Sequence, residues 1–443
     1  MPLAQTIDKS EIKILNTNSP APIQKIAVIG LGYVGLPLAV ALAKNYQVTG
    51  FDISLPRLEE LKNGFDRTGE IDEASLRSSS LHLTSDAMEL KDCQVFIVTV
   101  PTPVTQDNTP DLTPLEKASL TVGPLLKKGD IVCYESTVYP GVTEDFCAPI
   151  LEKASSFKSG QDFFLGYSPE RINPGDKVHT VDKITKIVSG QTPAVAETLR
   201  QIYGSMNGDN IFVAKSIKTA EAAKVIENTQ RDINIAFINE ITQIFHAMDV
   251  GIYDVLEAAG TKWNFLPFQP GLVGGHCIGV DPYYLATAAK ALNIDPKIIL
   301  AGRRINEDMS AHIAQRILNQ LNGTQQPRVL VLGLTFKENV PDLRNTKIID
   351  LILHLKEAGI AVDVHDAYAD AKEAKAFFGI DLITHLEGLE PYHCVVGAVA
   401  HEPYRALSPN AFVQLIHTQG TLFDLKNMWS TENIPENISY QTL

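Results

Sequence analysis

The sequence predicts an α/β fold in which two doubly wound, parallel-sheet domains are joined by a long central helix. Three observations support this prediction. Short, nearly continuous apolar runs alternate with helix-like segments near both ends of the chain, as is typical of parallel strands buried on both faces. A glycine-rich turn follows the first apolar run, and a long stretch of helical periodicity without proline or glycine separates the two alternating regions.

The N-terminal region contains the first set of predicted strands. Residues 1–24 precede it; they lack the apolar core of a signal peptide, and we expect a loosely held leader. Helix-like segments lie between the apolar runs, so the strands are expected to pair in parallel. The predicted strands are residues 25–30, 47–53, 94–100 and 131–135, with 162–167 and 187–189 as further candidates.

One long helix is predicted for residues 217–250, which contain neither proline nor glycine. Apolar residues recur there at helical spacing, so we expect one helix or two helices joined closely. These apolar residues are Ala220, Ala223, Ile226, Ile233, Phe237, Ile241, Ile244 and Phe245. We expect the helix to bridge the two domains and to pack against a second subunit in a homodimer or a dimer of dimers, although an ordinary core helix has the same periodicity.

A second alternating region predicts the C-terminal sheet. Turn-forming residues at 322–327 mark the boundary before it. The expected strands are residues 328–334, 361–365, 394–399 and 421–424. The predicted organisation is therefore a leader (1–24), a first sheet domain (25–214), a central helical domain (215–325) and a second sheet domain (326–443).

Composition and charge disfavour several classes of function. The formal net charge of -14 on 443 residues argues against nucleic-acid binding, because an acidic surface repels phosphate backbones. No apolar run approaches the roughly 18 residues of a membrane span. The five cysteines are scattered without a C-x-x-C pair, so neither a disulfide framework nor a metal site is expected, and a reducing, cytoplasmic compartment fits best.

The glycine motif G-x-G-x-x-G comprises Gly30, Gly32 and Gly35, with Tyr33 and Val34 between the last two glycines. It follows a predicted strand and precedes a helix-like segment. This context predicts a Rossmann-like dinucleotide-binding turn, in which a pyrophosphate approaches the backbone at the N-terminus of the helix.

The strand ends that follow indicate which dinucleotide binds. Asp52 ends the next predicted strand, where a carboxylate binds a ribose 2′-hydroxyl and repels a 2′-phosphate, so NAD is favoured over NADP. Arg57 weakens this inference, since a nearby arginine can hold a 2′-phosphate. Residues at the ends of later strands are expected to border the nicotinamide, unless they serve only turn formation. They are Thr99, Pro101, Thr102, Ser136 and Thr137.

A glycine-rich loop at residues 271–281 holds Cys277 and, four residues later, Asp281. Glycine lets the backbone approach a ligand closely, so a thiol in this loop is placed to react. The alternative is that Cys277 is a small buried hydrophobe, as many free cysteines are. A reactive thiol together with NAD suggests an oxidation that passes through a thioester.

Two further pairs of polar residues are candidates for the chemistry. Lys224 and Asn228 are four residues apart on the predicted long helix and share one face. The lysine either forms a surface ion pair or stabilises a developing alkoxide. Glu170 and Arg171 follow a predicted strand, and Glu170 is either a general base or one half of an exposed ion pair.

Over residues 24–430 the chain resembles the UDP-glucose/GDP-mannose dehydrogenase family. The resemblance rests on the glycine turn, P-T-P at 101–103, E-S-T-V at 135–138, S-P-E-R at 168–171, E-A-A-K with N-T at 221–229, G-G-H-C with an aspartate at 274–281, and G-L-T-F-K at 333–337. Within the family, residues 274–284 are most similar to the branch that acts on UDP-N-acetylhexosamines. The resemblance implies that the first Rossmann-like domain binds NAD and that the second, also Rossmann-like, binds a UDP-sugar.

This resemblance implies a four-electron oxidation of a nucleotide sugar at C6, from the alcohol to the carboxylate, with two NAD⁺ consumed in turn. Cys277 would form a thiohemiacetal and then a thioester, which water would hydrolyse. The substrate implied first is UDP-N-acetylglucosamine, oxidised to UDP-N-acetylglucosaminuronate for surface polysaccharide synthesis. UDP-N-acetylmannosamine, UDP-N-acetylgalactosamine, UDP-glucose and GDP-mannose are the alternatives.

Residue roles also follow from the resemblance, by matching position. Lys224 and Asp281 would assist proton transfer and stabilise oxyanions, while Thr137 and Glu170 would position or activate water. The UDP-sugar would be held by Asn228, Arg171, Lys337 and the loop 268–274 with Phe268, Gly271 and Gly274. NAD would be contacted by Asp52, Arg57 and Arg344. His276 adjoins the nucleophile but is not the expected base.

The sequence also departs from the family in one region and leaves two other classes of protein open. Lys262 and Trp263 lie where relatives that act on UDP-glucose carry an arginine that reaches a neighbouring subunit's substrate, which leaves Lys262, Arg303 or Arg304 as stand-ins. A two-electron 3-hydroxyacid dehydrogenase would use the lysine and the asparagine but need no cysteine. A non-catalytic NAD-binding regulator would need none of the reactive side chains.

Overall fold

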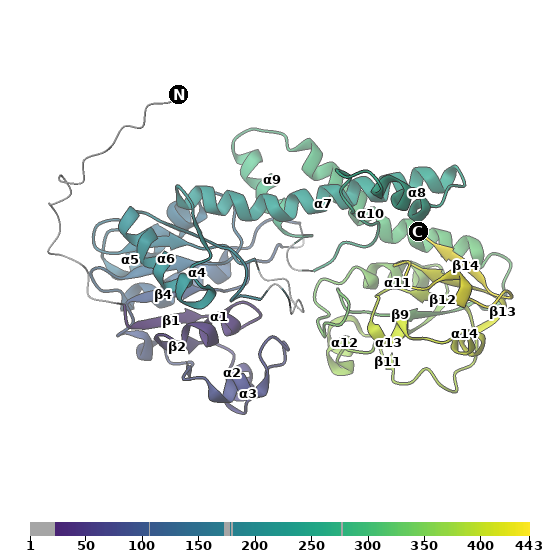
Figure 1. Ribbon diagram of the computed structural model, residues 1–443, viewed down its shortest axis with the longest axis horizontal. Helices are drawn as coiled ribbons and strands as arrows, with labels where there is room; N and C mark the ends of the chain where they lie inside the picture. Colours follow the sequence, from purple (N-terminus) through teal and green to yellow (C-terminus); the bar gives the residue numbers. More distant parts are fainter. Residues whose placement is uncertain (1–22, 106, 172–177, 179, 276–277) are drawn as a thin grey trace, which may run out of the picture.

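The computed structural model describes residues 23–105, 107–171, 178, 180–275 and 278–443. Two α/β sheets with their covering helices lie at opposite ends of an elongated molecule (Figure 1). A long helix, α7 (Ile217–Ala247), runs along one side from the first sheet towards the second. The predicted architecture of two doubly wound sheets joined by a central helix is confirmed.

The N-terminal sheet has the strand order β3-β2-β1-β4-β5-β6-β7-β8. Neighbouring strands are parallel, except that β6 and β7 pair antiparallel. The strand order reverses between β1 and β4, and the carboxyl ends of such a strand pair border the crevice where doubly wound sheets bind ligands. The strands are β1 (Lys25–Ile29), β2 (Gln47–Phe51), β3 (His82–Thr84), β4 (Val95–Val98), β5 (Ile131–Tyr134), β6 (Phe164–Tyr167), β7 (Lys186–Gly190) and β8 (Ile211–Val213).

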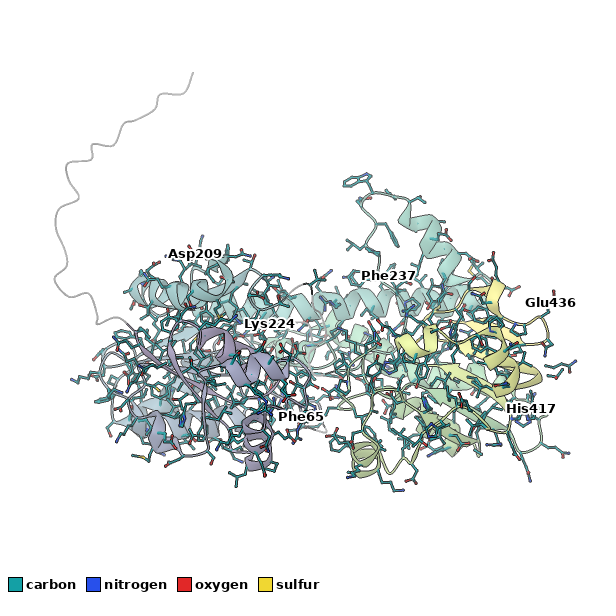
Figure 2. All side chains as sticks on the ribbon, turned by 60° about the horizontal axis from the view of Figure 1, so that its bottom comes forward. Phe65, Asp209, Lys224, Phe237, His417 and Glu436 are labelled. Atoms are coloured by element: carbon teal, nitrogen blue, oxygen red, sulfur yellow. The ribbon has the colours of Figure 1, made fainter. Side chains whose placement is uncertain are left out.

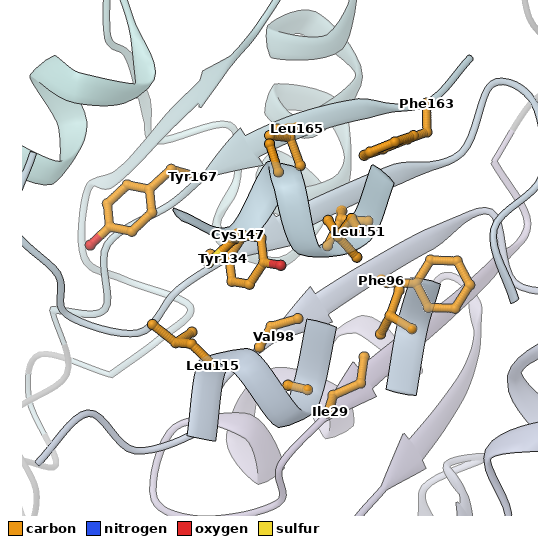
Figure 3. Packing of buried hydrophobic residues seen from close by; sticks show 14 of the residues in the cluster. Ile29, Phe96, Val98, Leu115, Tyr134, Cys147, Leu151, Phe163, Leu165 and Tyr167 are labelled. Carbon is orange, nitrogen blue, oxygen red and sulfur yellow. The ribbon is translucent and has the colours of Figure 1, made fainter. Parts of the chain in front are cut away.

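Helices cover both faces of this sheet and enclose two apolar clusters. On one face, Phe96 and Val98 pack with Leu115 and other buried residues (Figure 3). On the other face, Val28 packs with Leu199. Successive residues of a strand point to opposite faces, which is why the central strands are apolar throughout. The helices are α1 (Gly35–Leu42), α2 (Leu55–Lys62), α3 (Glu73–Ser78), α4 (Thr113–Val122), α5 (Ala148–Ser155) and α6 (Pro193–Asn207).

The central segment is built around α7, a single helix of 31 residues. Its N-cap is Ser216, whose hydroxyl accepts a hydrogen bond from the backbone N–H of Thr219. The helix packs against α9 (Asp281–Ala291) and α10 (Lys297–Gln320), and α8 (Ile252–Gly260) follows its C-terminus. The alternative of two closely joined helices is therefore excluded.

The C-terminal sheet is entirely parallel and has the order β11-β10-β9-β12-β13-β14. Its order also reverses, between β9 and β12. The strands are β9 (Arg328–Leu332), β10 (Ala361–His365), β11 (Leu382–Ile383), β12 (Tyr392–Gly397), β13 (Ile416–Asp424) and β14 (Ser439–Thr442). The helices are α11 (Ile348–Glu357), α12 (Ala371–Phe378), α13 (Glu402–Arg405) and α14 (Pro409–Leu415).

The structure differs from the sequence prediction mainly at the sheet edges. β3, β8, β11 and β14 were not predicted, and each is the outermost strand of its sheet. The strand predicted at 187–189 exists as β7, but it runs antiparallel to β6, an exception to the predicted parallel pairing. The domain limits at 24/25, 214/215 and 325/326 stay predictions. Within the described parts of the chain, no helix has the length and apolar character needed to cross a membrane.

Candidate active site

The glycine turn between β1 and α1 has two glycines with different constraints. A Cβ atom on Gly35 would lie 1.8 Å from the carbonyl oxygen of Gly30, so the packing of the turn requires glycine there. A Cβ atom on Gly32 would meet no protein atom within 4 Å. The protein itself does not require Gly32, whereas a pyrophosphate that approaches the backbone would. The N-terminus of α1 is capped by Val34 without a side-chain hydrogen bond, which suits an anion at that position.

Two predicted cofactor residues brace this turn. Asp52 accepts hydrogen bonds from the backbone N–H groups of Leu31 and Ser54, both at 2.8 Å. The buried Arg57 donates from Nε to the carbonyl oxygen of Leu31 at 2.9 Å and pairs with Asp66 at 2.7 Å. Arg57 therefore shapes the turn from within the protein, and its predicted contact with NAD stays a prediction.

The residues predicted to border the nicotinamide lie at the carboxyl ends of β4 and β5. The Thr99 hydroxyl is close to the carbonyl oxygens of both Ile29 and Gly30, at 3.0 and 2.8 Å. Ser136 donates to the carbonyl oxygen of Val100. Thr102 and Thr137 are half-buried, whereas Pro101 is exposed. The predicted residues are thus brought to the edge beside the glycine turn.

Arg344 reaches the same turn from the C-terminal sheet domain. Its guanidinium lies 5.2 Å from the centre of the Tyr33 ring. Two hydrogen bonds to Asp342, at 3.0 and 2.8 Å, hold that guanidinium in place. A cofactor on the glycine turn would therefore be bordered by a cation from the other sheet domain.

Lys224, Asn228 and Asp281 form a buried polar cluster between α7 and the start of α9. Figure 2 locates Lys224 on the long helix beside the N-terminal sheet domain. Asn228 donates from Nδ2 to Asp281 at 2.5 Å, and Asp281 is 1% exposed. Burial raises the pKa of Asp281 to about 6, although the Lys224 ammonium and the Asn228 hydrogen bond act to lower it. A carboxyl group that titrates near neutral pH is suited to proton transfer.

Glu170 and Arg171 do not pair with each other through their side chains. Glu170 is 8% exposed, and its carboxylate lies 3.2 Å from the ammonium of Lys186. The Arg171 guanidinium instead contacts Glu227 at 2.9 Å and the carbonyl oxygen of Thr185 at 3.0 Å. The alternative of an exposed Glu170–Arg171 ion pair is therefore wrong.

The predicted UDP-sugar residues divide into two groups. A narrow cavity is lined by Gly274 and Lys337 from the predicted set. Phe268 instead packs against an apolar cluster of α7 and α8. Gly271 is held through its backbone by the amide of Asn239, at 2.8 and 3.0 Å. The last two residues shape the loop around the cavity.

Several residues at the site were not predicted. Lys347 and Lys426 line the cavity with Lys337, as does Glu338. Lys347 is paired with Glu307 at 2.8 Å and with Asp350 at 3.0 Å. Lys186 and Glu135 form a buried ion pair next to Glu170. The sequence could have indicated Lys186, because a lysine at the first position of a largely apolar strand is unusual. No sequence pattern indicated Lys426, which lies beyond β13.

Cys277 and His276 lie outside the described residues. On one side of them, the backbone of Gly275 exchanges two hydrogen bonds with Asn345, at 3.0 and 2.6 Å. On the other side lies Asp281, already placed in the polar cluster. The two flanks of the predicted nucleophile are thus fixed by contacts with both the C-terminal sheet domain and α7.

One suggested stand-in for a subunit-crossing arginine is wrong. Arg303 is 1% exposed and pairs with Asp232 of the same chain at 2.5 Å, so it is not available to a second subunit. Arg304 and Lys262 are exposed.

Models of the UDP-glucose/GDP-mannose dehydrogenase family match three consecutive parts of the chain. The NAD binding domain of that family matches residues 24–207. The central domain matches residues 218–308, and the UDP binding domain matches residues 330–431. The glycine turn lies in the first part, α7 from its second residue onward lies in the second, and Lys337 lies in the third.

Individual relatives match over almost the full length. The chain is 52% identical to protein CapL of Staphylococcus aureus, over 93% of this chain and 97% of the relative. It is 52% identical to the UDP-N-acetyl-D-glucosamine 6-dehydrogenase of Pseudomonas aeruginosa, over 91% and 96%. Among solved structures, the UDP-N-acetylmannosamine dehydrogenase of Pyrococcus horikoshii superimposes with a TM-score of 0.85 at 30% identity, covering 95% of this chain and 99% of that one.

Proposed function

We propose a specific reaction for this chain, which belongs to the UDP-glucose/GDP-mannose dehydrogenase family and is an NAD-dependent nucleotide-sugar dehydrogenase. It oxidises UDP-N-acetylglucosamine at C6 to the uronate for surface polysaccharide synthesis. The choice of sugar is supported by relatives named UDP-N-acetyl-D-glucosamine 6-dehydrogenase at 52% and 48% identity. Relatives named UDP-N-acetyl-D-mannosamine dehydrogenase are at most 35% identical among those compared.

The observation that carries the proposed chemistry is the buried cluster in which Lys224 and Asn228 of α7 meet Asp281, the last residue of the cysteine loop. Bound NAD⁺ supplies the acceptor for the hydride that leaves C6. Asp281, with a pKa of about 6, accepts the hydroxyl proton, and the nearby Lys224 ammonium stabilises the alkoxide as it develops.

The second half of the reaction involves Cys277. Its thiolate adds to the C6 aldehyde and forms a thiohemiacetal, with the oxyanion stabilised by Lys224. Loss of a second hydride from C6, for which a second NAD⁺ bound in exchange for NADH would be the acceptor, gives a thioester. Water then forms a bond to the thioester carbon and gives its proton to Glu170, while the carbon–sulfur bond breaks and the carboxylate product is released. Thr137 positions this water.

The cavity lined by Gly274 and Lys337 supports binding of the UDP group. Lys337 and Lys426 lie around it and offer ammonium groups to a diphosphate. Glu338 also lines the cavity, and the third lysine, Lys347, is paired with Glu307 and Asp350. Glycine at position 274 is required by the close approach of the Asn345 carbonyl oxygen, which would lie 2.7 Å from a Cβ atom.

We also propose that the enzyme works in the cytoplasm as a homodimer or a dimer of dimers. The cysteines Cys93, Cys133, Cys147 and Cys394 are free thiols, as suits a reducing compartment. Ile226, Phe237 and Ile244 lie on one face of α7, because whole helical turns separate them, and each is about half exposed. This apolar stripe on α7 would be covered by a second copy of the chain.

The deciding experiment counts NADH per UDP-sugar with the purified protein. Two NADH per UDP-N-acetylglucosamine, with turnover lost in Cys277→Ser and retained in the control Cys93→Ser, would support the substrate, the reaction and the nucleophile. Two NADH from another nucleotide sugar would change the substrate only. One NADH per sugar, or full activity in Cys277→Ser, would contradict the thioester mechanism and favour a two-electron dehydrogenase.

A further inference from the structure

A fully buried lysine bridges two glutamates behind the N-terminal part of the site. Lys186, the first residue of β7, has a completely buried side chain. Its ammonium lies 2.6 Å from Glu135 Oε2 and 3.2 Å from Glu170 Oε2. Glu135 follows β5 and Glu170 lies just beyond β6, so three neighbouring strands bring the three charges together.

The carboxylate of Glu135 is held in place beside this lysine. Its other oxygen accepts a hydrogen bond from the hydroxyl of Tyr203 at 2.5 Å, and its side chain is as completely buried as that of Lys186. The Tyr203 ring also lies 5.4 Å from the lysine ammonium, and the Cys133 thiol is 3.5 Å from the Tyr203 hydroxyl. Lys186 on β7, Glu135 directly after β5 and Tyr203 on α6 are thus all held in place by regular secondary structure.

Glu170, in contrast, is the member of the group nearest to solvent. One of its oxygens faces Lys186, and the other accepts the backbone N–H of Arg171 at 2.7 Å. The Arg171 guanidinium is turned away, towards Glu227 and Thr185. The carboxylate is therefore fixed from two sides, and Lys186 is a cation in direct contact with it.

We propose that Lys186 is a positioning residue that orients Glu170 and keeps it ionised, and that Glu135 tunes this effect by sharing the same ammonium. This inference rests on the proposed function, in which Glu170 accepts the proton of the water that hydrolyses the Cys277 thioester. A protonated Glu170 cannot accept that proton, so the charge on Lys186 sets the pH range in which the thioester is released.

This arrangement of charges predicts that two substitutions change the protonation of Glu170 in opposite directions. Burial alone lowers the pKa of Lys186, but the two carboxylates raise it, so the lysine stays cationic. Burial raises the pKa of Glu135, against the attraction of the Lys186 ammonium. Removing the cation favours the protonated form of Glu170, whereas removing the charge of Glu135 favours its ionised form. A substitution that only loosened the packing would not produce opposite effects.

The experiment compares the pH dependence of kcat in the wild-type enzyme with UDP-N-acetylglucosamine and in the variants Lys186→Met, Lys186→Arg and Glu135→Gln. At pH 7 we expect Lys186→Met to lose about 100-fold in kcat, as expected for loss of a general base, with KM changed by less than about threefold. Its acid limb should move to higher pH. Lys186→Arg should recover much of the activity, and Glu135→Gln should move the acid limb to lower pH.

A second readout identifies the step. Acid quenching during turnover, followed by intact-protein mass spectrometry, should detect a covalent sugar-nucleotide adduct on Lys186→Met at pH 7 and less of it at pH 9. An unchanged acid limb in folded Lys186→Met, or a shift in the same direction in Glu135→Gln, would overturn the proposal. Should Lys186→Met not fold, the Glu135→Gln limb decides it alone. A wild-type enzyme that forms no NADH with this sugar would overturn the proposed substrate, whereas normal turnover with unshifted variants would overturn only the role of Lys186.

Discussion

The buried carboxyl group of Asp281, which we propose as the proton acceptor, lowers the stability of the folded protein when it is ionised. Its carboxyl group has a pKa of about 6 in the folded protein, against 3.8 for an ordinary aspartate, because it is buried. The folded state therefore holds this proton more tightly than the unfolded chain does. Stability contributed by this group is full below about pH 4, falls as the pH rises from about 4 to 6, and stays lower above that range.

We predict that Asp281→Asn makes the protein more stable at pH 7 and nearly inactive. Neutralising the side chain removes a cost of about 3 kcal/mol at pH 7, whereas at pH 4 the carboxyl group is already protonated and little changes. Turnover should fall by about 100-fold or more. Thermal unfolding at both pH values, with NADH formation at pH 7, checks both parts. A variant that is less stable at pH 7 than at pH 4, relative to wild type, would contradict the prediction.

Gly32 and Gly35 provide a matched pair of substitutions in the glycine turn. Gly35→Ala places a Cβ atom 1.8 Å from the Gly30 carbonyl oxygen, so we predict a lower unfolding temperature or no folded protein. Gly32→Ala meets no protein atom within 4 Å, and we predict wild-type stability with NAD affinity lowered by about tenfold or more. Differential scanning fluorimetry with and without NAD⁺ separates the two effects. Equal NAD affinity in Gly32→Ala would argue against a pyrophosphate at this position.

At the scale of residues, the sequence predicted the positions of polar side chains better than their contacts. Lys224 and Asn228 were predicted to share one face of the long helix, and the resemblance implied a joint role for Lys224 and Asp281. The structure brings the three together, and their catalytic roles stay predictions. For Glu170 the sequence offered Arg171 as an alternative partner, because that residue is adjacent in sequence, whereas Lys186 lies on a strand further along the chain. Pairing across strands depends on sheet register, which local patterns do not contain.

At the scale of elements, a buried polar cluster lies inside the contact between α7 and α10. Asp232 of α7 is completely buried and pairs with Arg303 of α10 at 2.5 Å. Asn306 donates to the same carboxylate at 2.8 Å and also contacts Asn239, which holds the loop at Gly271. Burial raises the pKa of Asp232, and the Arg303 guanidinium opposes this. This buried polar cluster thus links the long helix to the loop beside the cavity lined by Gly274 and Lys337.

We predict that Arg303→Met lowers stability by about 3 kcal/mol or more, because it leaves a buried carboxylate without its cation. Adding Asp232→Asn should restore part of the loss, since the neutral amide still bonds to Asn306. Thermal unfolding of the two single variants and the double variant measures this coupling. Losses that simply add would show that the two charges do not interact. Arg304→Met, on the exposed side of α10, is the control and should change stability little.

The elements that the sequence did not predict are the edge strands. β11 has two residues and β3 has three, too few for a periodic pattern to be recognised. β8 and β14 include exposed or half-buried residues, as edge strands often do. The central strands were predicted because burial on both faces makes them apolar throughout. An edge strand forms by pairing with a neighbouring strand. Its position therefore depends on the whole sheet and not on its own sequence pattern.

At the scale of the whole molecule, the sequence indicated two sheets and a bridging helix but not the contact between the sheet domains. The stacking of Arg344 over Tyr33 joins a loop after β9 to the glycine turn after β1. The intervening chain contains the whole central segment, so their proximity depends on how α7 and α10 pack. The long helix was predicted because an uninterrupted amphipathic pattern is local, whereas the approach of distant loops is not.

The apolar stripe on α7 leads to the last prediction, which concerns assembly. Phe237 is 56% exposed, and Figure 2 locates it on the long helix between the two sheet domains. Trp263, beyond α8, is 92% exposed, and large aromatic side chains rarely stay in contact with water when a second surface can cover them. We predict that the wild-type protein has a mass of about twice or four times its 48.5 kDa chain in solution.

Phe237→Glu should convert this assembly to a smaller species, because two copies related by a twofold axis would place the introduced charges in one apolar interface. Leu353→Glu is the matched control: Leu353 is 48% exposed but lies on α11 of the C-terminal sheet domain, away from the stripe. Light scattering coupled to size-exclusion chromatography measures both masses. A wild-type mass of one chain, or a Phe237→Glu assembly as large as that of Leu353→Glu, would rule out the α7 stripe as the subunit interface. Activity measured on the separated species would then tell whether the site in one chain needs the other copy.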